Sequence, residues 1–347
     1  MFWGKGTSVL GLDIGSSHIK IVHLMRQGQN WKLENWAIAK TPKDALSDGN
    51  IAIKGELVKV LTDTLSKYKF RESKVVTAVS NQRIVTRYIT MPPMPENELK
   101  EAVYWEAKNH IPIYDEDMKI DYKVLGKTHD NRTILVIAGI ARQTALDYLE
   151  VLRETKLKPV AIDIYPVSLF RFFGTSSGIQ QPYCIVDLGY SCVKLLIIKA
   201  GSIYADSIVP VGLREFEGNL VDYFGIGEEE LPSFLESFSF ASIRDEQEHA
   251  HLFYTIKPYL NELINSINRF IHFFDTQIRD HPIGNIILTG GGALWKGMAT
   301  FIAQETGITT VSELELVNPW LDASDLTQGQ LHLLSNAIGL AMRGVMY

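Results

Sequence analysis

The residues best suited to chemistry occur in two short stretches, each of which pairs an aspartate with a glycine turn and a lysine. The shared residues are Asp13, Gly15, Ser17 and Lys20 in the first stretch, and Asp187, Gly189, Ser191 and Lys194 in the second. The offset is constant, since 187 − 13 and 194 − 20 both equal 174. A glycine turn lets backbone N–H groups approach an anion, and an aspartate can hold Mg²⁺ directly or through water. One such turn is ordinary, but two in register predict duplicated halves that face each other across a phosphate-binding cleft.

Both stretches have the pattern of a β-hairpin turn. Apolar runs at 9–12 and 19–24 flank the first turn, and runs at 184–186 and 193–198 flank the second. Short runs rich in β-branched residues, separated by a glycine-containing turn, are typical of paired strands. The sequence therefore predicts that strand pairs position the two aspartates.

A third motif is a run of three glycines between an apolar strand and a helix. Residues 286–288 predict a buried strand, which runs into Thr289, Gly290, Gly291, Gly292 and Ala293, and a helix is expected from about 295 to 306. Glycines leave bare surface on which a flat ring or a ribose can lie, beside free N–H groups at a helix start. A flexible loop is the alternative interpretation.

Composition limits the class of protein. The chain has 347 residues, 46% hydrophobic and 21% charged, which is enough for two domains with a large core. Its net charge of −6 argues against a general nucleic-acid binder. The presence of only two cysteines, Cys184 and Cys192, fits a reducing compartment. We interpret them as two small buried residues, with a structural disulfide as the alternative. The sequence has no apolar run long enough to span a bilayer and no signal-peptide pattern, so we expect a soluble, cytoplasmic protein.

The remaining apolar spacing predicts the elements that position these motifs. Residues 85–162 are typical of a compact inserted α+β unit, with the order strand, helix, two strands, helix, strand, and with no convergent polar cluster. Such a unit indicates an interaction module. The other expected elements are a strand at 31–39, helices at 56–68, 168–173, 213–224, 255–274 and 330–342, a buried strand at 75–79, and an acidic helical arm at 228–248.

In this order, the motifs resemble those of the actin, Hsp70 and sugar-kinase superfamily, and more narrowly those of the PilM family of type IV pilus assembly proteins, which is related to FtsA. The matching stretches are Gly11-Leu12-Asp13-Ile14-Gly15-Ser16-Ser17, the helix from Met91-Pro92 to Pro112 with Glu106-Ala107 and Ile111-Pro112, Pro159-Val160-Ala161-Ile162-Asp163, Leu288-Thr289-Gly290-Gly291-Gly292-Ala293 and the closing 336–344. The resemblance covers nearly the full length.

The resemblance implies an α/β fold of the actin-like (ribonuclease H-like) duplicated type with an FtsA-type 1C subdomain. The implied divisions are 1–84 (1A, first part), 85–162 (1C), 163–180 (return to 1A and linking helix), 181–212 (2A, first part), 213–280 (2B), 281–318 (2A, adenosine loop) and 319–347 (C-terminal helix packing on 1A). It also implies ATP and Mg²⁺ in the cleft. The implied ATP-binding residues are Asp13, Gly15, Ser16, Ser17, His18 and Lys20, then Asp187, Gly189, Tyr190 and Ser191, then Gly290, Gly291, Gly292 and Ala293, with Asp13 and Asp187 holding the metal, through water.

The resemblance further implies a partner, the short cytoplasmic N-terminal peptide of PilN, an inner-membrane protein, bound in a groove between subdomains 1A and 1C. Tyr104, Trp105 and Lys108 border the expected groove, where aromatic anchors suit peptide capture. Trp105 as a simple core residue is the alternative. Because the chain ends at Tyr347 without the C-terminal amphipathic helix of FtsA, we expect it to reach the inner membrane only through partners such as PilN and other assembly-platform proteins.

Departures from the superfamily pattern predict weak or absent hydrolysis. Tyr165-Pro166 stands where related ATPases carry a Glu or Gln that orients the attacking water, with Asp163 two residues earlier. A phenol is a poor base at neutral pH. His18 and Cys192 also replace commoner small hydroxyl residues. Two other interpretations remain open at this point: an FtsA-like cell-division protein, and a sugar- or acetate-type kinase on the same fold.

Overall fold

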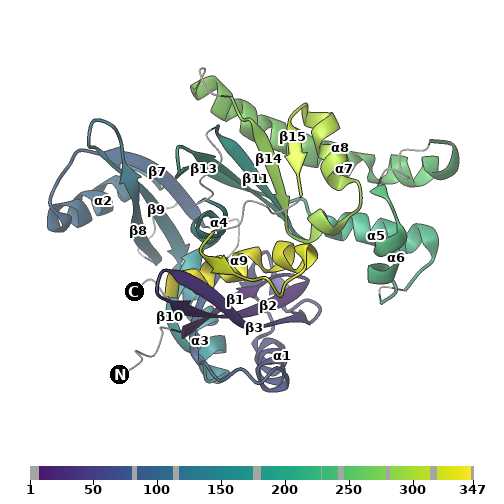
Figure 1. Cartoon of the computed structure of the whole chain (residues 1–347), viewed down its shortest axis with the longest axis horizontal. Coiled ribbons are helices and arrows are strands. Elements are labelled where there is room, and N and C mark those ends of the chain that lie inside the picture. Colours follow the sequence, from purple (N-terminus) through teal and green to yellow (C-terminus); the bar gives the residue numbers. More distant parts are fainter. Residues whose placement is uncertain are drawn as a thin grey trace. The chain divides into compact units, whose positions relative to one another are not determined.

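The computed structural model describes residues 8–79, 84–111, 117–174, 181–227, 229–240, 246–278, 282–312 and 319–344 (Figure 1). The chain divides into two compact units. Unit 1 consists of Met1–Arg171, Ser202–Ala205 and Asn336–Tyr347, and unit 2 of Phe172–Gly201 and Asp206–Ser335. Each unit is built on its own mixed β-sheet.

The sheet of unit 1 has the strand order β10-β6-β1-β2-β3. Its strands are β1 (Ser8–Ile14), β2 (His18–Gln27), β3 (Asn30–Lys40), β6 (Lys74–Val79) and β10 (Lys158–Ile164). The first three form an antiparallel meander, whereas β6 runs parallel to β1 and β10 runs parallel to β6. Parallel strands that are buried on both faces show continuous apolar runs, and five of the six residues of β6 are buried accordingly.

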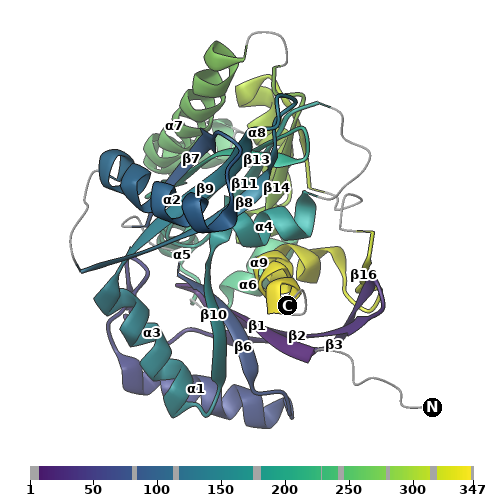
Figure 2. The same ribbon diagram turned by 90° about the vertical axis from the view of Figure 1, so that its left-hand side faces the viewer.

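Strand β1 lies between two helical layers (Figure 2). Because successive side chains of a strand alternate, those of β1 divide between the two layers. Leu10, Leu12 and Ile14 point into a core shared with α1 (Lys54–Lys67) and α3 (Arg142–Glu154). Gly11 lies on the opposite face, where a Cβ would be only 1.9 Å from the Ala337 carbonyl oxygen of α9 (Gln328–Gly344). Asp13 follows Gly11 on that same face of the strand, because successive residues of a strand alternate.

The sheet of unit 2 repeats the order of the first sheet, with β13-β12-β11-β14-β15. Its strands are β11 (Tyr183–Leu188), β12 (Val193–Lys199), β13 (Ser202–Val209), β14 (Asn285–Thr289) and β15 (Thr309–Val311). As in unit 1, the first two strands are antiparallel and the next two are added in parallel. The duplication predicted from two short motifs therefore extends through both sheets.

In unit 2, the bounds of α5 (Leu213–Phe224) equal those predicted from the sequence. The bounds of the other helices differ from the prediction. The predicted acidic arm contains the short α6 (Leu231–Ser237), and α7 (Glu246–Gln277) begins well before the expected position 255. The glycine run continues into a 3₁₀ turn (Gly291–Leu294), so that α8 (Met298–Thr306) starts later than predicted.

The remaining short strands are β4 (Leu46–Ser47), β5 (Asn50–Ile51) and β16 (Leu321–Asp322).

Within unit 1, a three-stranded sheet of order β7-β9-β8 carries α2 on one face (Figure 2). Its elements are β7 (Val85–Met91), α2 (Glu96–His110), β8 (Met118–Lys127) and β9 (Thr133–Ala141). The sequence assigned α3 and β10 to the same compact unit. In the structure β10 pairs with β6 and α3 packs on α1, so both elements belong to the larger sheet. The local pattern could not reveal this, because strand partners are set by non-local contacts.

Among the described helices, none is long and apolar enough to cross a membrane. The two cysteines are thiols and form no disulfide with each other. Cys184 is buried in β11, which raises the pKa of its thiol to about 12. The alternative of a disulfide is therefore wrong, and the interpretation of two small buried residues is confirmed for Cys184, whereas Cys192 is half-buried.

Candidate functional site

The first hairpin turn places Asp13 directly opposite Lys20. The two residues are cross-strand partners of β1 and β2, and their side chains form an ion pair with 3.0 Å between Lys20 Nζ and Asp13 Oδ2. The Gly15 N–H closes the turn by donating to the His18 carbonyl oxygen at 3.1 Å. Asp13 is only 6% exposed, so that its charge is held by a partner rather than by bulk water.

The second hairpin turn has the same geometry. Asp187 is the cross-strand partner of Lys194, and Lys194 Nζ lies 3.2 Å from Asp187 Oδ2. The Gly189 N–H donates to the Cys192 carbonyl oxygen at 3.2 Å. Pair, turn and hydrogen bond therefore all recur at the offset seen in the sequence. Within each hairpin the predicted residues come together as expected.

Both turn glycines are required by their neighbours. A Cβ on Gly15 would lie 2.8 Å from the His18 carbonyl oxygen and 3.0 Å from Lys20 Nζ. A Cβ on Gly189 would lie 2.9 Å from the Cys192 carbonyl oxygen. Any larger residue would open the turn, so that the glycines keep the backbone accessible at the tip of each hairpin.

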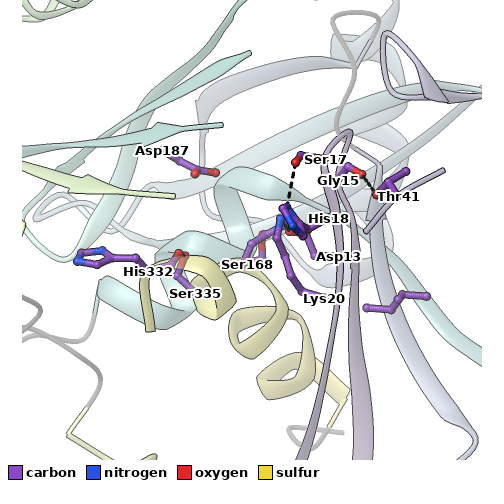
Figure 3. Close-up of polar contacts among 12 residues, drawn as sticks. Asp13, Gly15, Ser17, His18, Lys20, Thr41, Ser168, Asp187, His332 and Ser335 are labelled. Atoms are coloured by element: carbon purple, nitrogen blue, oxygen red, sulfur yellow. Dashed lines mark hydrogen bonds and ion pairs between the residues drawn. The ribbon is translucent and has the colours of Figure 1, made fainter. Parts of the chain in front are cut away.

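Thr41 braces the first turn from the end of β3 (Figure 3). Its hydroxyl donates to the Gly15 carbonyl oxygen at 2.6 Å, and its N–H donates to the Ser17 carbonyl oxygen at 2.8 Å. The sequence does not reveal this role of Thr41, because nothing in its local pattern marks a hydrogen bond across 26 positions. Ser17 Oγ and His18 Nδ1 lie 2.9 Å apart at the tip of the same turn.

The second turn is braced differently, by the start of α5. Leu213 N–H donates to the Gly189 carbonyl oxygen at 3.0 Å, and Arg214 N–H donates to the Tyr190 carbonyl oxygen at 2.9 Å. The Arg214 guanidinium also lies 5.2 Å from the centroid of the Tyr190 ring. Gly212 permits this approach, since a Cβ there would be 2.2 Å from the Tyr190 carbonyl oxygen. The first N–H groups of this helix thus fix the turn.

The glycine run lies against the second hairpin. Gly290 has a φ of +79°, a conformation that favours glycine, and a Cβ there would be 2.3 Å from Asp187 Oδ1. A Cβ on Gly292 would be 2.2 Å from the Leu188 side chain. Asp187 and the glycine run are therefore neighbours within unit 2. Thr289 Oγ1 anchors the run by donating to the His332 carbonyl oxygen at 3.3 Å.

Positive charge gathers around the first turn. Burial lowers the pKa of His18 below its usual value, and the nearby ammonium groups of Lys20 and Lys40 lower it further. By surface area the ring is exposed, so that its desolvation comes from the crowded turn and not from core packing. Both effects favour the neutral form of the His18 ring. An anion at the turn would raise this pKa, which links anion binding to proton uptake.

No general base stands at the start of the linking helix α4 (Tyr165–Phe173). Tyr165 is 1% exposed and lies in the core. The carboxylate of Asp163 is held by Arg171 at 2.7 Å and by Arg343 at 3.2 Å. Both oxygens of this carboxylate are therefore engaged by guanidinium groups, which leaves it poorly placed to orient a water molecule. In the described part of the chain, no three His, Cys, Asp or Glu side chains gather into a metal site.

The outward face of α2 carries an aromatic surface. Trp105 is 70% exposed and Tyr104 is 42% exposed, so that the alternative of a core tryptophan is wrong. Lys108 Nζ lies 5.2 Å from the centroid of the Trp105 ring, a cation–π geometry. With Glu101 these side chains line a shallow depression of about 200 Å³. We call these four residues the Trp105 surface.

Comparison with known proteins identifies relatives over nearly the full length. The family model for type IV pilus assembly protein PilM matches residues 11–345. A structure of the PilM–PilN type IV pilus biogenesis complex aligns with a TM-score of 0.79 at 24% identity, covering 97% of this chain and 98% of that one.

Two more distant structures share the architecture. The ethanolamine utilization protein EutJ from Carboxydothermus hydrogenoformans aligns with a TM-score of 0.57 at 15% identity, covering 96% and 89% of the two chains. A nucleotide-free diol dehydratase-reactivating factor aligns at 0.54 and 8% identity, covering 98% and 100%. With the duplicated sheets, these likenesses show an actin-like α/β fold.

Proposed function

The chain belongs to the PilM family of type IV pilus assembly proteins, and we propose that it acts in pilus assembly as an ATP-binding protein that captures the N-terminal segment of PilN. The family match does not favour the alternatives of a cell-division protein or a small-molecule kinase. The observation that carries the nucleotide proposal is the recurrence of one Asp–Lys pair and one glycine turn in two hairpins. The likeness to a PilM–PilN complex supports the partner.

Each proposed nucleotide-binding residue has a role that fits its surroundings. Gly15, Ser16, Ser17 and His18 would present N–H and side-chain donors to phosphate, and Lys20 would add positive charge. Gly189, Tyr190 and Ser191 would do the same from the second hairpin. The backbone from Gly290 to Ala293 would support the adenosine. Its glycines pack so closely against Asp187 and Leu188 that no side chain fits at Gly290 or Gly292, which leaves the backbone bare.

A magnesium ion would neutralise part of the phosphate charge when ATP is bound. Asp13 and Asp187 would hold it through water, because one oxygen of each carboxylate already accepts from a lysine. Carboxylate oxygens are ligands that Mg²⁺ prefers, so these residues fit the group in chemistry.

We expect binding without fast hydrolysis. A water-orienting carboxylate or amide at the start of α4 would be required for turnover. Tyr165 is buried there, and Asp163 is held by Arg171 and Arg343. ATP would thus act as a ligand that stabilises one conformation, and the conformation would set the affinity for the peptide.

For the partner, the Trp105 surface offers what an extended peptide needs. An exposed tryptophan beside a lysine supplies both a flat apolar contact and a charge, and such aromatic positions dominate peptide binding energies. We propose that Tyr104, Trp105 and Lys108 border the groove that receives PilN. The protein would then lie in the cytoplasm and be recruited to the inner membrane by this partner and by other assembly-platform proteins.

The nucleotide proposal is tested by calorimetry with MgATP. Asp13→Asn keeps the shape of the side chain and removes its charge, so we expect the affinity to fall at least about tenfold, as for loss of a charge-assisted contact. Asp147→Asn is the matched control, because Asp147 lies on α3 and pairs with Lys54 at the surface. A wild-type protein that takes up no MgATP, or equal affinity in the two variants, would contradict the proposal.

The partner proposal is tested by titrating a PilN N-terminal peptide. Trp105→Ala should weaken binding at least about tenfold, since anchor residues contribute about 2 kcal/mol or more. Its melting temperature should stay unchanged, because the ring is 70% exposed. Tyr254→Ala serves as control, removing a ring that is 63% exposed in unit 2. Equal losses in both variants would place the peptide elsewhere.

A further inference from the structure

The edge of the unit 1 sheet at which β6 and β10 begin carries a dense group of basic residues. The two strands are parallel, and Lys74 and Lys158 are cross-strand partners at their first positions. Short turns connect α1 to β6 and α3 to β10, so that both helices end at this edge. The helices pack side by side on one face of the sheet (Figure 2). We call the following residues the basic edge: Lys67, Lys69, Arg71, Lys74, Arg153, Lys156 and Lys158.

The positive charge of the basic edge is not balanced by the fold. All seven side chains are exposed. Two acidic residues, Glu72 and Glu154, stand among them, which leaves a net charge of +5 in a chain whose net charge is −6. Glu72 is half-buried, and one of its oxygens accepts from the backbone N–H groups of the next two residues. Within the described residues, no carboxylate forms an ion pair with any of the seven cations.

Both helices end in the same left-handed turn, and each turn carries a lysine. Lys69 follows α1 with a φ of +55°, and Lys156 follows α3 with a φ of +62°. In each turn the lysine N–H donates to the carbonyl oxygen three residues before it, at 3.1 Å and 2.9 Å. Glycine is the usual residue at such a position, because a Cβ is unfavourable there. Lysine therefore stands twice where glycine would fit the backbone better.

The helix dipole explains only part of this charge. Basic residues in the last turn of a helix balance its dipole, which accounts for Lys67 and Arg153. Lys74 and Lys158 begin strands, whose dipoles are small, and like charges on neighbouring strands repel each other. A surface of one sign that its own fold does not balance indicates a partner of opposite charge.

The start of β1 lies at the same edge. Because β1 is parallel to β6, with Leu10 beside Val75, its first residue Ser8 lies level with the start of β6. Residues 1–7 lie outside the described part of the chain, and their sequence includes Phe2, Trp3 and Lys5. Aromatic and basic residues together are typical of segments that bind the headgroup region of a membrane.

From these observations we propose that the basic edge binds the anionic headgroups of a membrane surface directly, with Phe2 and Trp3 as aromatic contacts in the headgroup region. The charges come from the ends of two helices and the starts of two strands along one edge, which suits an extended anionic surface. The net charge of the whole chain disfavours a nucleic acid.

This contact would add to recruitment by PilN. It departs from the expectation that the chain reaches the membrane only through partners. Each lysine or arginine near an anionic leaflet strengthens binding about fivefold, and stable attachment usually needs two such signals. A weak direct contact beside a membrane-bound partner would supply both.

The test is co-sedimentation of the full chain with vesicles of phosphatidylcholine alone, or of phosphatidylcholine and phosphatidylglycerol in equal parts. We expect binding to the mixed vesicles, weakened by salt. Lys69→Gly/Lys156→Gly should weaken it about 25-fold, since two charges are lost. This variant should melt at the same temperature as the wild type or higher, because glycine favours the left-handed conformation.

Two further variants serve as controls for charge and for the aromatic residues. Lys100→Gln/Lys119→Gln removes the same charge from exposed positions on α2 and β8, and should leave the affinity for mixed vesicles unchanged. Phe2→Ser/Trp3→Ser should weaken binding to the mixed vesicles about tenfold, as expected for loss of apolar contact in the headgroup region.

The proposal is overturned if the mixed vesicles bind no better than phosphatidylcholine, if the two lysine pairs lose binding equally, or if Phe2→Ser/Trp3→Ser binds like the wild type. A lower melting temperature of Lys69→Gly/Lys156→Gly together with lost binding would assign these lysines to folding instead. Release from the vesicles by inorganic phosphate, but not by sodium chloride of equal ionic strength, would show a phosphate site. Tighter binding to a DNA duplex than to the vesicles would show a nucleic-acid surface. The vesicles contain no PilN, so the result is independent of the proposed partner.

Discussion

Replacement of Gly339 by alanine tests the packing that supports the first hairpin. Gly339 lies in the middle of α9, where a Cβ would be 2.0 Å from the Ser168 carbonyl oxygen of α4. The same place carries a hydrogen bond from Arg171 Nη1 to the Gly339 carbonyl oxygen at 3.1 Å and a contact between the Ser168 hydroxyl and Asn336 Oδ1. The backbones of α9 and α4 therefore meet directly at Gly339, and no flexible side chain lies between them that could move to make room for a Cβ.

The magnitude follows from two opposing effects. Alanine is favoured over glycine in a helix interior by about 1 kcal/mol. Overpacking costs about 1 to 3 kcal/mol where side chains can move, and more against a backbone, since α9 and α4 must separate by more than about 1 Å to restore an ordinary contact. We expect the free energy of unfolding of unit 1 to fall by at least about 2 kcal/mol.

The assay is urea unfolding of the variant beside Gly55→Ala. Gly55 is an exposed residue of α1 in the same unit, and a Cβ there meets nothing within 4 Å. That control should leave stability unchanged or raise it by up to about 1 kcal/mol. The reasoning is refuted if Gly339→Ala is as stable as Gly55→Ala, because the close approach of α9 to α4 would then be absent in solution.

Three further predictions concern unit 2. Gly290→Ala should lower stability by more than about 3 kcal/mol and abolish MgATP binding in calorimetry, whereas Gly201→Ala, with a similar φ of +70° but no atom within 4 Å, should cost only about 1 kcal/mol. Burial raises the pKa of Glu217 from 4.5 to about 7, so the folded protein favours the protonated carboxyl and loses stability as the pH rises between these values. The Glu217→Gln variant should therefore melt at a higher temperature than the wild type at pH 8 and at the same temperature at pH 4. Burial lowers the pKa of His332 below 6.5, so the protein loses stability as the pH drops below that value. In a series of melting curves at decreasing pH, the melting temperature of His332→Gln should fall less than that of the wild type.

Local chemistry made the hairpins predictable. An aspartate and a lysine seven positions apart around a four-residue turn become cross-strand partners in any tight antiparallel hairpin, so that Asp13 and Lys20 had to meet once the strands formed. The same spacing fixed Asp187 with Lys194. Apolar alternation and helical periodicity located most elements, with α5 matching to the residue. The interpretation of Trp105 as a core residue was wrong, because the sequence around an aromatic residue of a helix does not show whether that residue faces the core or the solvent.

The sequence alone determined the repeat, the two hairpins and the family to which the chain belongs, since these rest on residues that are neighbours along the chain or follow a short period. Only the tertiary structure decided that Thr41 braces the first turn, that β10 joins the larger sheet, and that Asp163 is held by Arg171 and Arg343. Those contacts join residues whose separation along the chain follows no period. They form because the packed sheets and helices bring the partners together, and no local pattern records which partners will meet.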